Sequence, residues 1–211
     1  YKDLIHAGAH LSETERERLK QLNEELSILE TQFSKNLLTD TNDLAVLVDD
    51  IKELAGLGEN EISAAAAAAK ERGHEGKWLI AMVNFTGNPV LDSLSNRELR
   101  KKIMQDSLLK ANRANENDNK PVILKIIKLR AERAKLFGKN THAEHVIAVQ
   151  TAEHPDNVHA MLRKIAPAAV RNAKAEADDL EKSAGSHIES WDWGYYTEKV
   201  RLEKYNIDTN K

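Results

Sequence analysis

The chain has 211 residues, of which 41% are hydrophobic and 31% are charged, a balance that indicates a folded globular protein. Its formal net charge is -3 and it has no cysteine, which disfavours nucleic-acid binding, disulfide scaffolds and cysteine-ligated zinc. The longest apolar run, the alanines at 64–69, is far shorter than the roughly 20 residues of a membrane span. We therefore expect a soluble, cytoplasmic protein that binds neither nucleic acid nor membrane.

The first predicted element is a long amphipathic helix over residues 12–38. Ser12 and Glu15 form a capping box, and apolar residues then recur at spacings of three and four. The stripe favours packing within a larger helical body, and a free coiled coil is the alternative.

A small α/β insert is predicted over residues 43–94. Short apolar, partly β-branched runs predict strands near 44–49 and 77–84. Between them, an alanine-rich helix over 59–72 ends at Gly73. A turn is predicted at 86–89, where glycine, asparagine and proline follow one another.

Residues 95–205 are predicted to be helical throughout. Capping boxes, prolines at first helical positions and glycines just past the ends set the expected boundaries. The expected helices start at Ser95 (to about Asn115), Pro121 (to 137), Thr141 (to about Val149), Pro155 (to about Ala184, bent at Pro167) and Asp192 (to Tyr205).

These elements predict a mainly α fold, a multi-helical array with a small β element. We interpret residues 1–211 as a single helical segment of a larger protein. The chain opens at Tyr1 without a methionine and closes at Lys211 on polar residues, which suggests excision from a longer polypeptide.

His6 and His10 have the i, i+4 spacing of the zinc-binding HExxH motif. In that motif both histidines bind zinc and the glutamate activates water, but here Ala7 stands at the glutamate position. Capping or solvent-facing histidines are therefore the favoured interpretation.

A second histidine cluster contains His142, Glu144 and His145. The string resembles an inverted zinc motif but has Thr141 where a histidine is needed. Glu144 is expected to act in a capping box, and the histidines to lie on a polar helix start. A surface metal held by His142 and His145 is the alternative. Nearby in sequence lie Glu153, His154 and His159.

Two basic clusters are interpreted as solvated helix faces rather than phosphate sites, because apolar stripes and acidic residues interleave with them. No glycine-rich phosphate loop and no Gly-x-Ser-x-Gly motif is present in the sequence. The clusters are Arg97, Arg100, Lys101 and Lys102, and then Arg130, Arg133 and Lys135.

Large aromatic residues gather at 191–196. The favoured interpretation is that Trp193, Tyr196 and Val200 form the buried stripe of the last helix. A peptide groove lined by these aromatic rings is the alternative.

Several strings, read in order, resemble one known family. They are Leu47-Val48-Asp49-Asp50, Leu54-Ala55-Gly56-Leu57, Gly76-Lys77-Trp78-Leu79-Ile80, Asn96-Arg97-Glu98-Leu99-Arg100, Leu129-Arg130-Ala131-Glu132, Ala134-Lys135-Leu136-Phe137-Gly138 and Trp191-Asp192-Trp193 with Tyr196, Arg201 and Lys204-Tyr205. Together they resemble the thimet oligopeptidase-like zinc metallopeptidases, most closely the bacterial peptidyl-dipeptidases, also called dipeptidyl carboxypeptidases. The stretch from His142 to His154 departs from the family's usual strings.

The resemblance implies a zinc peptidase with a helical body around a deep channel, which admits short unfolded peptides and releases C-terminal dipeptides. It also implies that HExxH and the third zinc ligand lie downstream of this stretch. No residue of this chain matches a zinc ligand, the general base or another catalytic residue, and substrate-binding residues are not identified. We expect a non-catalytic channel-wall segment, inactive and without zinc of its own, whose partner is the remaining catalytic part and which self-associates when isolated. A stand-alone helical interaction module is the alternative.

Overall fold

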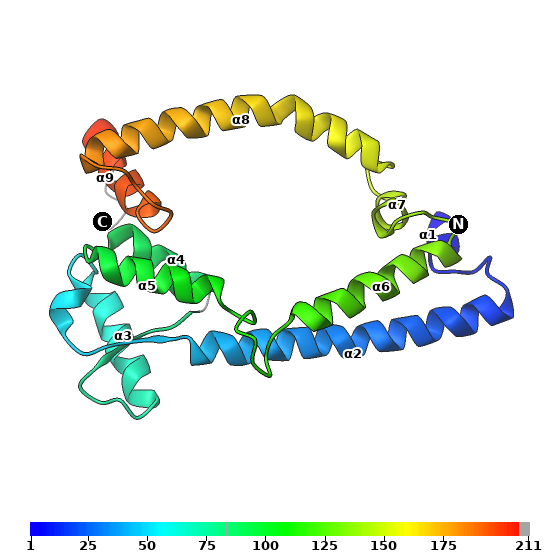
Figure 1. Cartoon of the computed structure of the whole chain (residues 1–211), viewed down its shortest axis with the longest axis horizontal. Helices are drawn as coiled ribbons and strands as arrows, with labels where there is room; N and C mark the ends of the chain where they lie inside the picture. The colour runs from blue at the N-terminus through cyan, green and yellow to red at the C-terminus, as the bar shows by residue number, and fades with distance from the viewer. Residues whose placement is uncertain (83, 207–211) are drawn as a thin grey trace. The chain divides into compact units, whose positions relative to one another are not determined.

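A computed structural model of the chain describes residues 1–82 and 84–206, without the side chains of residues 2, 3 and 84–88. The fold is mainly α-helical with one small antiparallel sheet, which confirms the predicted fold class (Figure 1). In chain order the elements are α1 (Lys2–His6), α2 (Glu13–Asp43), β1 (Val46–Val48), the 3-10 helix η1 (Ile51–Leu54), α3 (Glu59–Glu71), β2 (Trp78–Ile80), α4 (Asn84–Ser93), α5 (Arg97–Leu108), α6 (Lys120–Leu136), α7 (His142–Ile147), α8 (Pro155–Ala184) and α9 (Trp193–Tyr205).

The chain divides into two compact units. Unit 1 comprises Tyr1–Asn36 and Asp118–Val170, and unit 2 comprises Leu37–Asn117 and Arg171–Lys211. Within the described residues, no helix is both long and apolar enough to span a membrane.

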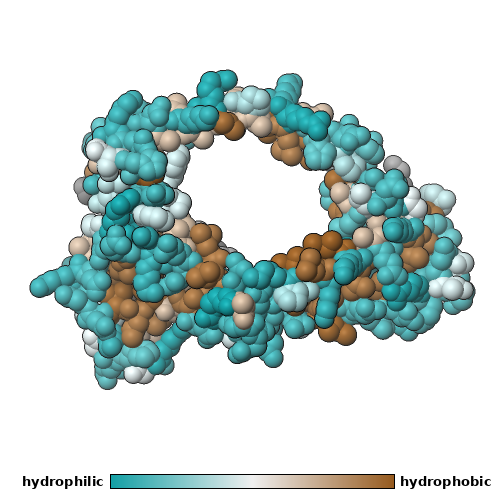
Figure 2. Space-filling model, in the orientation of Figure 1, coloured by the Kyte–Doolittle hydropathy of each residue, from teal (hydrophilic) through white to brown (hydrophobic). Residues whose placement is uncertain are grey.

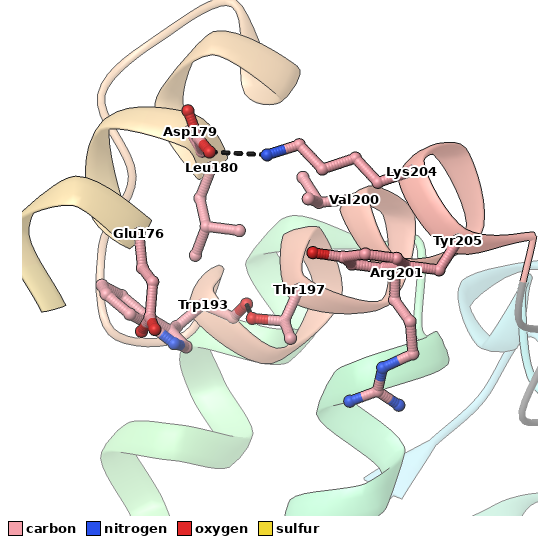
Figure 3. Close-up of a pocket in the computed structure, with 9 residues that line it drawn as sticks. All are labelled: Glu176, Asp179, Leu180, Trp193, Thr197, Val200, Arg201, Lys204 and Tyr205. Atoms are coloured by element: carbon pink, nitrogen blue, oxygen red, sulfur yellow. Dashed lines mark hydrogen bonds and ion pairs between the residues drawn. The ribbon is translucent and has the colours of Figure 1, made fainter. Parts of the chain in front are cut away.

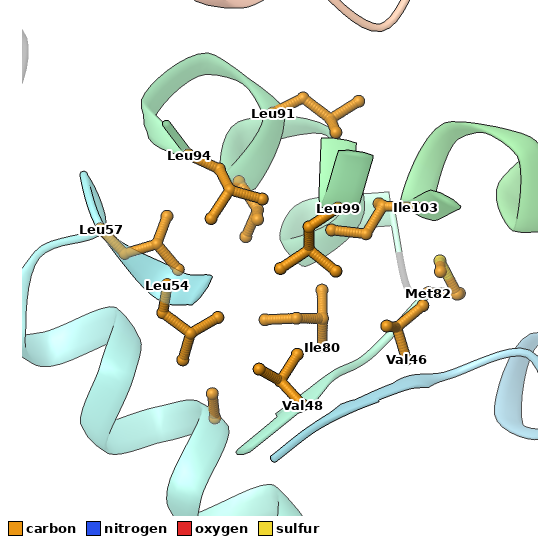
Figure 4. Close-up of a cluster of buried hydrophobic side chains, with 12 residues drawn as sticks. Val46, Val48, Leu54, Leu57, Ile80, Met82, Leu91, Leu94, Leu99 and Ile103 are labelled. Atoms are coloured by element: carbon orange, nitrogen blue, oxygen red, sulfur yellow. The ribbon is translucent and has the colours of Figure 1, made fainter. Parts of the chain in front are cut away.

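Unit 2 is built on the sheet. Strands β1 and β2 pair antiparallel with Val46 opposite Ile80 and Val48 opposite Trp78. Because side chains alternate along a strand, Val46, Val48 and Ile80 share one face, and all three are buried. Residues from η1, α3, α4 and α5 complete the cluster, including Leu54, Leu94 and Ile103, none of which is exposed (Figure 4).

Gly56 fixes how the end of η1 meets the end of α4. Its φ is +99°, and a Cβ atom there would lie 2.1 Å from the carbonyl oxygen of Ser93. A side chain is therefore excluded both by backbone conformation and by contact with backbone. The close approach allows the Ser95 N–H to donate to the Ala55 carbonyl at 2.8 Å.

The structure corrects three boundaries in unit 2. Residues 86–89 belong to helix α4 and not to a turn, because Pro89 costs the helix only one N–H while Val90 and Leu91 gain burial in the core. The strand predicted over 77–84 is only Trp78–Ile80, and residue 83 lies outside the described residues. Helix α5 is capped by Asn96, which accepts from the Leu99 N–H at 3.2 Å, and not by Ser95.

A further correction concerns the end of α5, which stops at Leu108 rather than near Asn115. Ala111 and Ala114 then adopt left-handed backbone conformations, with φ of 53° and 55°. The buried Asp40 carboxylate accepts a hydrogen bond from the Ala111 N–H at 2.7 Å and from Arg113 Nε at 3.1 Å. The chain after α5 is thus held by a carboxylate from α2, which no local pattern could indicate.

Unit 1 is organised by the pairing of α2 with α6. Only Leu26, Val122 and Ile126 form a buried hydrophobic cluster there. The partly buried Leu29, Phe33 and Leu129 pack against this cluster. Polar contacts add to it: Asn36 donates to Asn119 Oδ1 at 3.0 Å, and Asn119 donates to the Phe33 carbonyl at 3.0 Å.

Large apolar side chains remain exposed on unit 1. Ile123, Leu124 and Ile127 of α6 are 40%, 61% and 57% exposed, and apolar surface is visible along this helix in Figure 2. In the part of α8 that belongs to unit 1, Met161 and Ile165 are likewise more than half exposed. These faces match the packing stripes of a helical body, yet nothing in unit 1 covers them.

Candidate functional site

The end of α8, the helix α9 and the aromatic segment before it form the candidate site of unit 2. Asp192 anchors this region to α5. It is 1% exposed, and its carboxylate accepts from Arg97 Nη2 at 2.7 Å and from Arg100 Nη2 at 2.7 Å. Burial opposes ionisation of Asp192, but the hydrogen bonds from the two arginines outweigh it and hold its pKa below the ordinary value.

Arg100 is the residue that organises the cluster. Its guanidinium also donates to the carbonyls of Leu94 at 2.8 Å, Ser95 at 3.1 Å and Trp191 at 3.1 Å. It lies 4.2 Å from the centre of the Tyr195 ring. A buried arginine needs this number of acceptors, since an unpaired charge in the interior is costly.

The prediction that Arg97, Arg100, Lys101 and Lys102 lie on a solvated face was wrong for Arg100, which is 1% exposed. Sequence spacing placed Arg100 beside the buried Leu99 and Ile103 but gave no sign of its partner 92 residues away. Asp192 begins α9 as predicted, although its side chain makes no capping bond and instead pairs with the arginines.

The aromatic stripe predicted to be buried is not. Trp193 is 38% exposed and no residue of α9 is fully buried. The physical reason is that α9 contacts the rest of unit 2 through the Asp192 and Tyr195 side. Trp193 and Val200 instead line a pocket of about 460 Å³ between α8 and α9 (Figure 3).

This pocket combines aromatic, apolar and charged side chains. Leu180 and Val200 lie between Trp193 and Tyr205, and the ion pair of Lys204 with Asp179 spans one side at 2.6 Å (Figure 3). The hydrogen bond between these two groups raises the pKa of Lys204 and lowers that of Asp179. Such a surface can hold an apolar side chain beside a charged group.

Asp92 lies at the contact between α4 and α9 and was missed by sequence reasoning. A Cβ atom on Gly194 would lie 2.0 Å from Asp92 Oδ1, so glycine allows this carboxyl to sit against the first turn of α9. Burial, with a contribution from Glu198, raises the pKa of Asp92. No sequence motif distinguishes Asp92 from any other helix carboxylate.

In unit 1, the histidines are brought together rather than left in solvent. The rings of His6 and His145 stack with centroids 4.3 Å apart and planes 13° apart. Phe137 lies 4.4 Å from His145 and 5.9 Å from His10, measured between ring centroids. His10 is exposed, in keeping with the favoured interpretation, and His6 is half-buried. His145 lies on a short helix as expected, but it is not at a polar, solvated position, since it is only 6% exposed and packs against His6.

The other residues of the second cluster serve local structure. Thr141 accepts from the Glu144 N–H at 3.1 Å, and Glu144 in turn accepts from the Asn140 N–H at 3.0 Å. His154 accepts from the Asp156 N–H at 3.3 Å, and Glu153 and His159 are exposed. In the part of the chain that the structure describes, no three His, Asp or Glu side chains are grouped to hold a metal ion.

The second basic cluster links α6 to α2. Arg130 pairs with Glu30 at 2.9 Å, and Arg133 donates to the side chain of Asn23 at 3.1 Å. Burial lowers the pKa of Arg133, with a further contribution from Arg130. These arginines are therefore contacts between helices and not an open phosphate site, while Lys135 is exposed.

Comparison with known proteins identifies the family. The model of peptidase family M3 matches residues 90–211, which include α5, α9 and the pocket. The chain is 34% identical to the dipeptidyl carboxypeptidase of Escherichia coli over 99% of its length, and 35% identical to that of Salmonella typhimurium over 98%. It is 32% identical to oligopeptidase A of Haemophilus influenzae over 98% of its length.

The chain belongs to peptidase family M3. It spans 31% and 32% of the lengths of the two dipeptidyl carboxypeptidases and 32% of the oligopeptidase A. The resemblance to thimet oligopeptidase-like metallopeptidases in the sequence is confirmed by this match.

Proposed function

We propose that these residues form a non-catalytic helical part of a zinc metallopeptidase that cleaves short unfolded peptides and releases C-terminal dipeptides. In this proposal the segment is channel wall and limits substrate size. The observation that carries it is the alignment of nearly the whole chain with two proteins named dipeptidyl carboxypeptidase. The cytoplasm is the proposed location, and short peptides are the proposed substrates.

The catalytic groups are proposed to lie in polypeptide outside these 211 residues. The described side chains do not fit a zinc centre, since no three potential ligands are grouped, and we derive no step of hydrolysis for them. The relatives are about three times longer than the matched segment, which leaves room for zinc ligands and a general base elsewhere. Zinc, bound there, would polarise the scissile carbonyl and activate water.

The remaining polypeptide is the proposed partner of unit 1. Ile123, Leu124 and Ile127 on α6 and Met161 and Ile165 on α8 are exposed apolar residues on amphipathic helices. Covering them would contribute about 25 cal/mol for each square ångström of apolar surface buried. The same exposure supports self-association of the isolated chain, and it is also what a stand-alone interaction module would present.

An assay on the purified 211 residues tests this function. The chain is incubated with zinc and an unstructured octapeptide with a free C-terminus, and products are analysed by mass spectrometry, with Escherichia coli dipeptidyl carboxypeptidase as the positive control. We expect no dipeptide release from the chain. Zinc-dependent release that a chelator abolishes would show that the segment is catalytic and contradict the proposal.

A calorimetric zinc titration tests the alternative that the chain is a metal-binding helical protein. We expect no uptake at His142 and His145, because Thr141 and Glu144 are engaged in capping and the His145 ring is stacked on His6 and contacts Phe137. Stoichiometric uptake that is lost when both histidines are changed to alanine would favour a metal-binding helical protein instead.

A further inference from the structure

The packing of α1 depends on a cluster of rings that we call the histidine clasp, defined as His6, Phe137 and His145. His6 ends α1, Phe137 follows α6, and His145 lies on α7. The His6 and His145 rings stack at 4.3 Å, and Phe137 contacts the His145 ring from another side at 4.4 Å. The clasp thus joins the first helix of the chain to two elements more than 130 residues later, all within unit 1.

We propose that the histidine clasp is a pH-sensitive latch, closed when the His145 imidazole is neutral and opened, with release of α1, when that ring binds a proton. The geometry carries the proposal. The neutral His145 imidazole stacks favourably on the His6 ring, 4.3 Å away, whereas a charged imidazole is poorly hydrated in this buried contact. Histidine is the side chain whose charge ordinarily changes near physiological pH.

The neighbouring groups that shift the pKa of His145 are positive or neutral, and each of them lowers it. The groups that face it electrostatically are His6 from α1, Arg133 from α6, Lys139 from the connection to α7, and His142 from α7 itself. Glu144 is on the same helix, but its carboxylate accepts from the Asn140 N–H. Protonation of His145 therefore adds a positive charge close to those of Arg133 and Lys139.

Burial adds to this effect. His145 is 6% exposed, and burial, followed by His6 and the nearby cations, lowers its pKa to about 4. In the open state the imidazole is hydrated and has its ordinary pKa of about 6.5. The closed latch is therefore fully favoured above pH 6.5 and weakens as the pH falls from 6.5 toward 4. By linkage, the equilibrium constant for opening rises about 30-fold between pH 8 and pH 5.

The contacts beyond the clasp explain why opening would be local. After α1, Leu11 is buried, and Arg16 Nε donates to the Leu11 carbonyl at 3.0 Å. Neither of these Leu11 contacts includes a histidine, so Leu11 stays in place when the clasp opens and the opening is confined to the residues before it.

Amide hydrogen exchange on the intact 211-residue chain tests the latch. Exchange at residues 4–10 is measured at pH 8 and pH 5 and divided by the intrinsic exchange rates at each pH. We expect protection at pH 8 and a loss of roughly 30-fold at pH 5, whereas protection within α6 is retained. An unchanged protection factor at residues 4–10 would overturn the proposal.

Two variants assign the effect to His145. His145→Phe keeps an aromatic ring that cannot bind a proton, so protection at residues 4–10 should become independent of pH. His159→Phe, the matched control on an exposed face of α8, should keep the wild-type dependence. Retention of the 30-fold change in His145→Phe would overturn the proposal.

NMR titration of the histidines in the wild-type chain tests the latch even if His145→Phe does not fold. The ring protons of His145 in the wild-type chain should titrate well below the ordinary histidine pKa of about 6.5. A midpoint for His145 at or above about 6.5 would contradict the latch.

Discussion

Units 1 and 2 are built from similar amphipathic helices, but they bury very different amounts of apolar surface. In the described residues, twelve hydrophobic side chains form one connected buried cluster in unit 2, and three form the cluster between α2 and α6 in unit 1. Unit 1 relies on polar contacts such as Asn36 with Asn119 and leaves Leu124 and Ile127 exposed. The difference shows that unit 2 has an extensive core of its own, whereas unit 1 has a smaller core and leaves apolar helix faces exposed.

The largest effect is expected from breaking the buried ion cluster of unit 2. Asp192→Asn removes the charge that neutralises Arg100, which is 1% exposed, and leaves a buried cation without a counter-ion. The free energy of unfolding should fall by roughly 3–5 kcal/mol. Chemical denaturation measures the change, and Asp178→Asn on the exposed face of α8 is the matched control with no expected effect. A loss below about 1 kcal/mol would show that the cluster does not stabilise unit 2.

Truncating one core side chain in each unit should show the difference between their cores, as a larger loss in the free energy of unfolding for unit 2. Ile103→Ala, in the unit 2 cluster, should cost about 2–5 kcal/mol, and Ile126→Ala, in the small unit 1 cluster, should fall at or below the low end of that range. All three tryptophans, Trp78, Trp191 and Trp193, lie in unit 2 and report only on that unit.

Two spectroscopic signals compare the stability of the two units in the wild-type chain. Far-UV circular dichroism, which sees both units, should begin to change at lower urea concentration than tryptophan fluorescence. Coincident transitions would mean that the chain unfolds as one cooperative body, and that unit 1 is not less stable than unit 2.

Asp40 in unit 2 is expected to make a contribution to the free energy of unfolding that is lost in acid. The hydrogen bond from Arg113, opposed by burial and helped by the Ala111 N–H, lowers the pKa of Asp40 to about 2 from an ordinary 3.8. Its stabilisation is therefore present above pH 3.8 and is lost as the pH falls toward 2, a loss of about 2 kcal/mol. Asp40→Asn should flatten this part of the stability profile, measured by urea unfolding between pH 5 and pH 2. An equally steep profile in the variant would assign the acid dependence to other carboxyls.

The smallest effect is expected from the surface ion pair of unit 1. Glu30→Gln breaks the 2.9 Å contact with Arg130, in which both side chains are partly exposed. Exposed pairs contribute less than about 1 kcal/mol, and salt screens them. The loss in stability should therefore shrink further in 1 M salt. A loss above about 2 kcal/mol would show that polar contacts, and not a missing partner, stabilise unit 1.

The sequence predicted the helices well where local signals exist. Ser12, Gly73, Pro121, Thr141 and Pro155 mark ends that the structure places within a residue or two, because caps, prolines and glycines act on their own backbone. Both strands were found from their apolar runs.

What the sequence could not reveal depends on contacts between distant residues. Arg100 and Asp192 are 92 residues apart, and nothing local distinguishes the buried Arg100 from the exposed Lys102. His6 and His145 were each interpreted from the sequence around them, and their stacking is seen only in the tertiary structure. The end of α5 was placed too late because Asp40 fixes the following backbone from 71 residues away.

A chimera tests most directly whether the exposed apolar face of α6 in unit 1 contacts the rest of a family M3 peptidase. The 211 residues replace the matching segment of Escherichia coli dipeptidyl carboxypeptidase, with and without Ile127→Glu, and dipeptide release is measured. We expect an active chimera that Ile127→Glu inactivates, although the same change alters the stability of the isolated chain by no more than about 0.5 kcal/mol. A chimera that remains fully active with Ile127→Glu would contradict it.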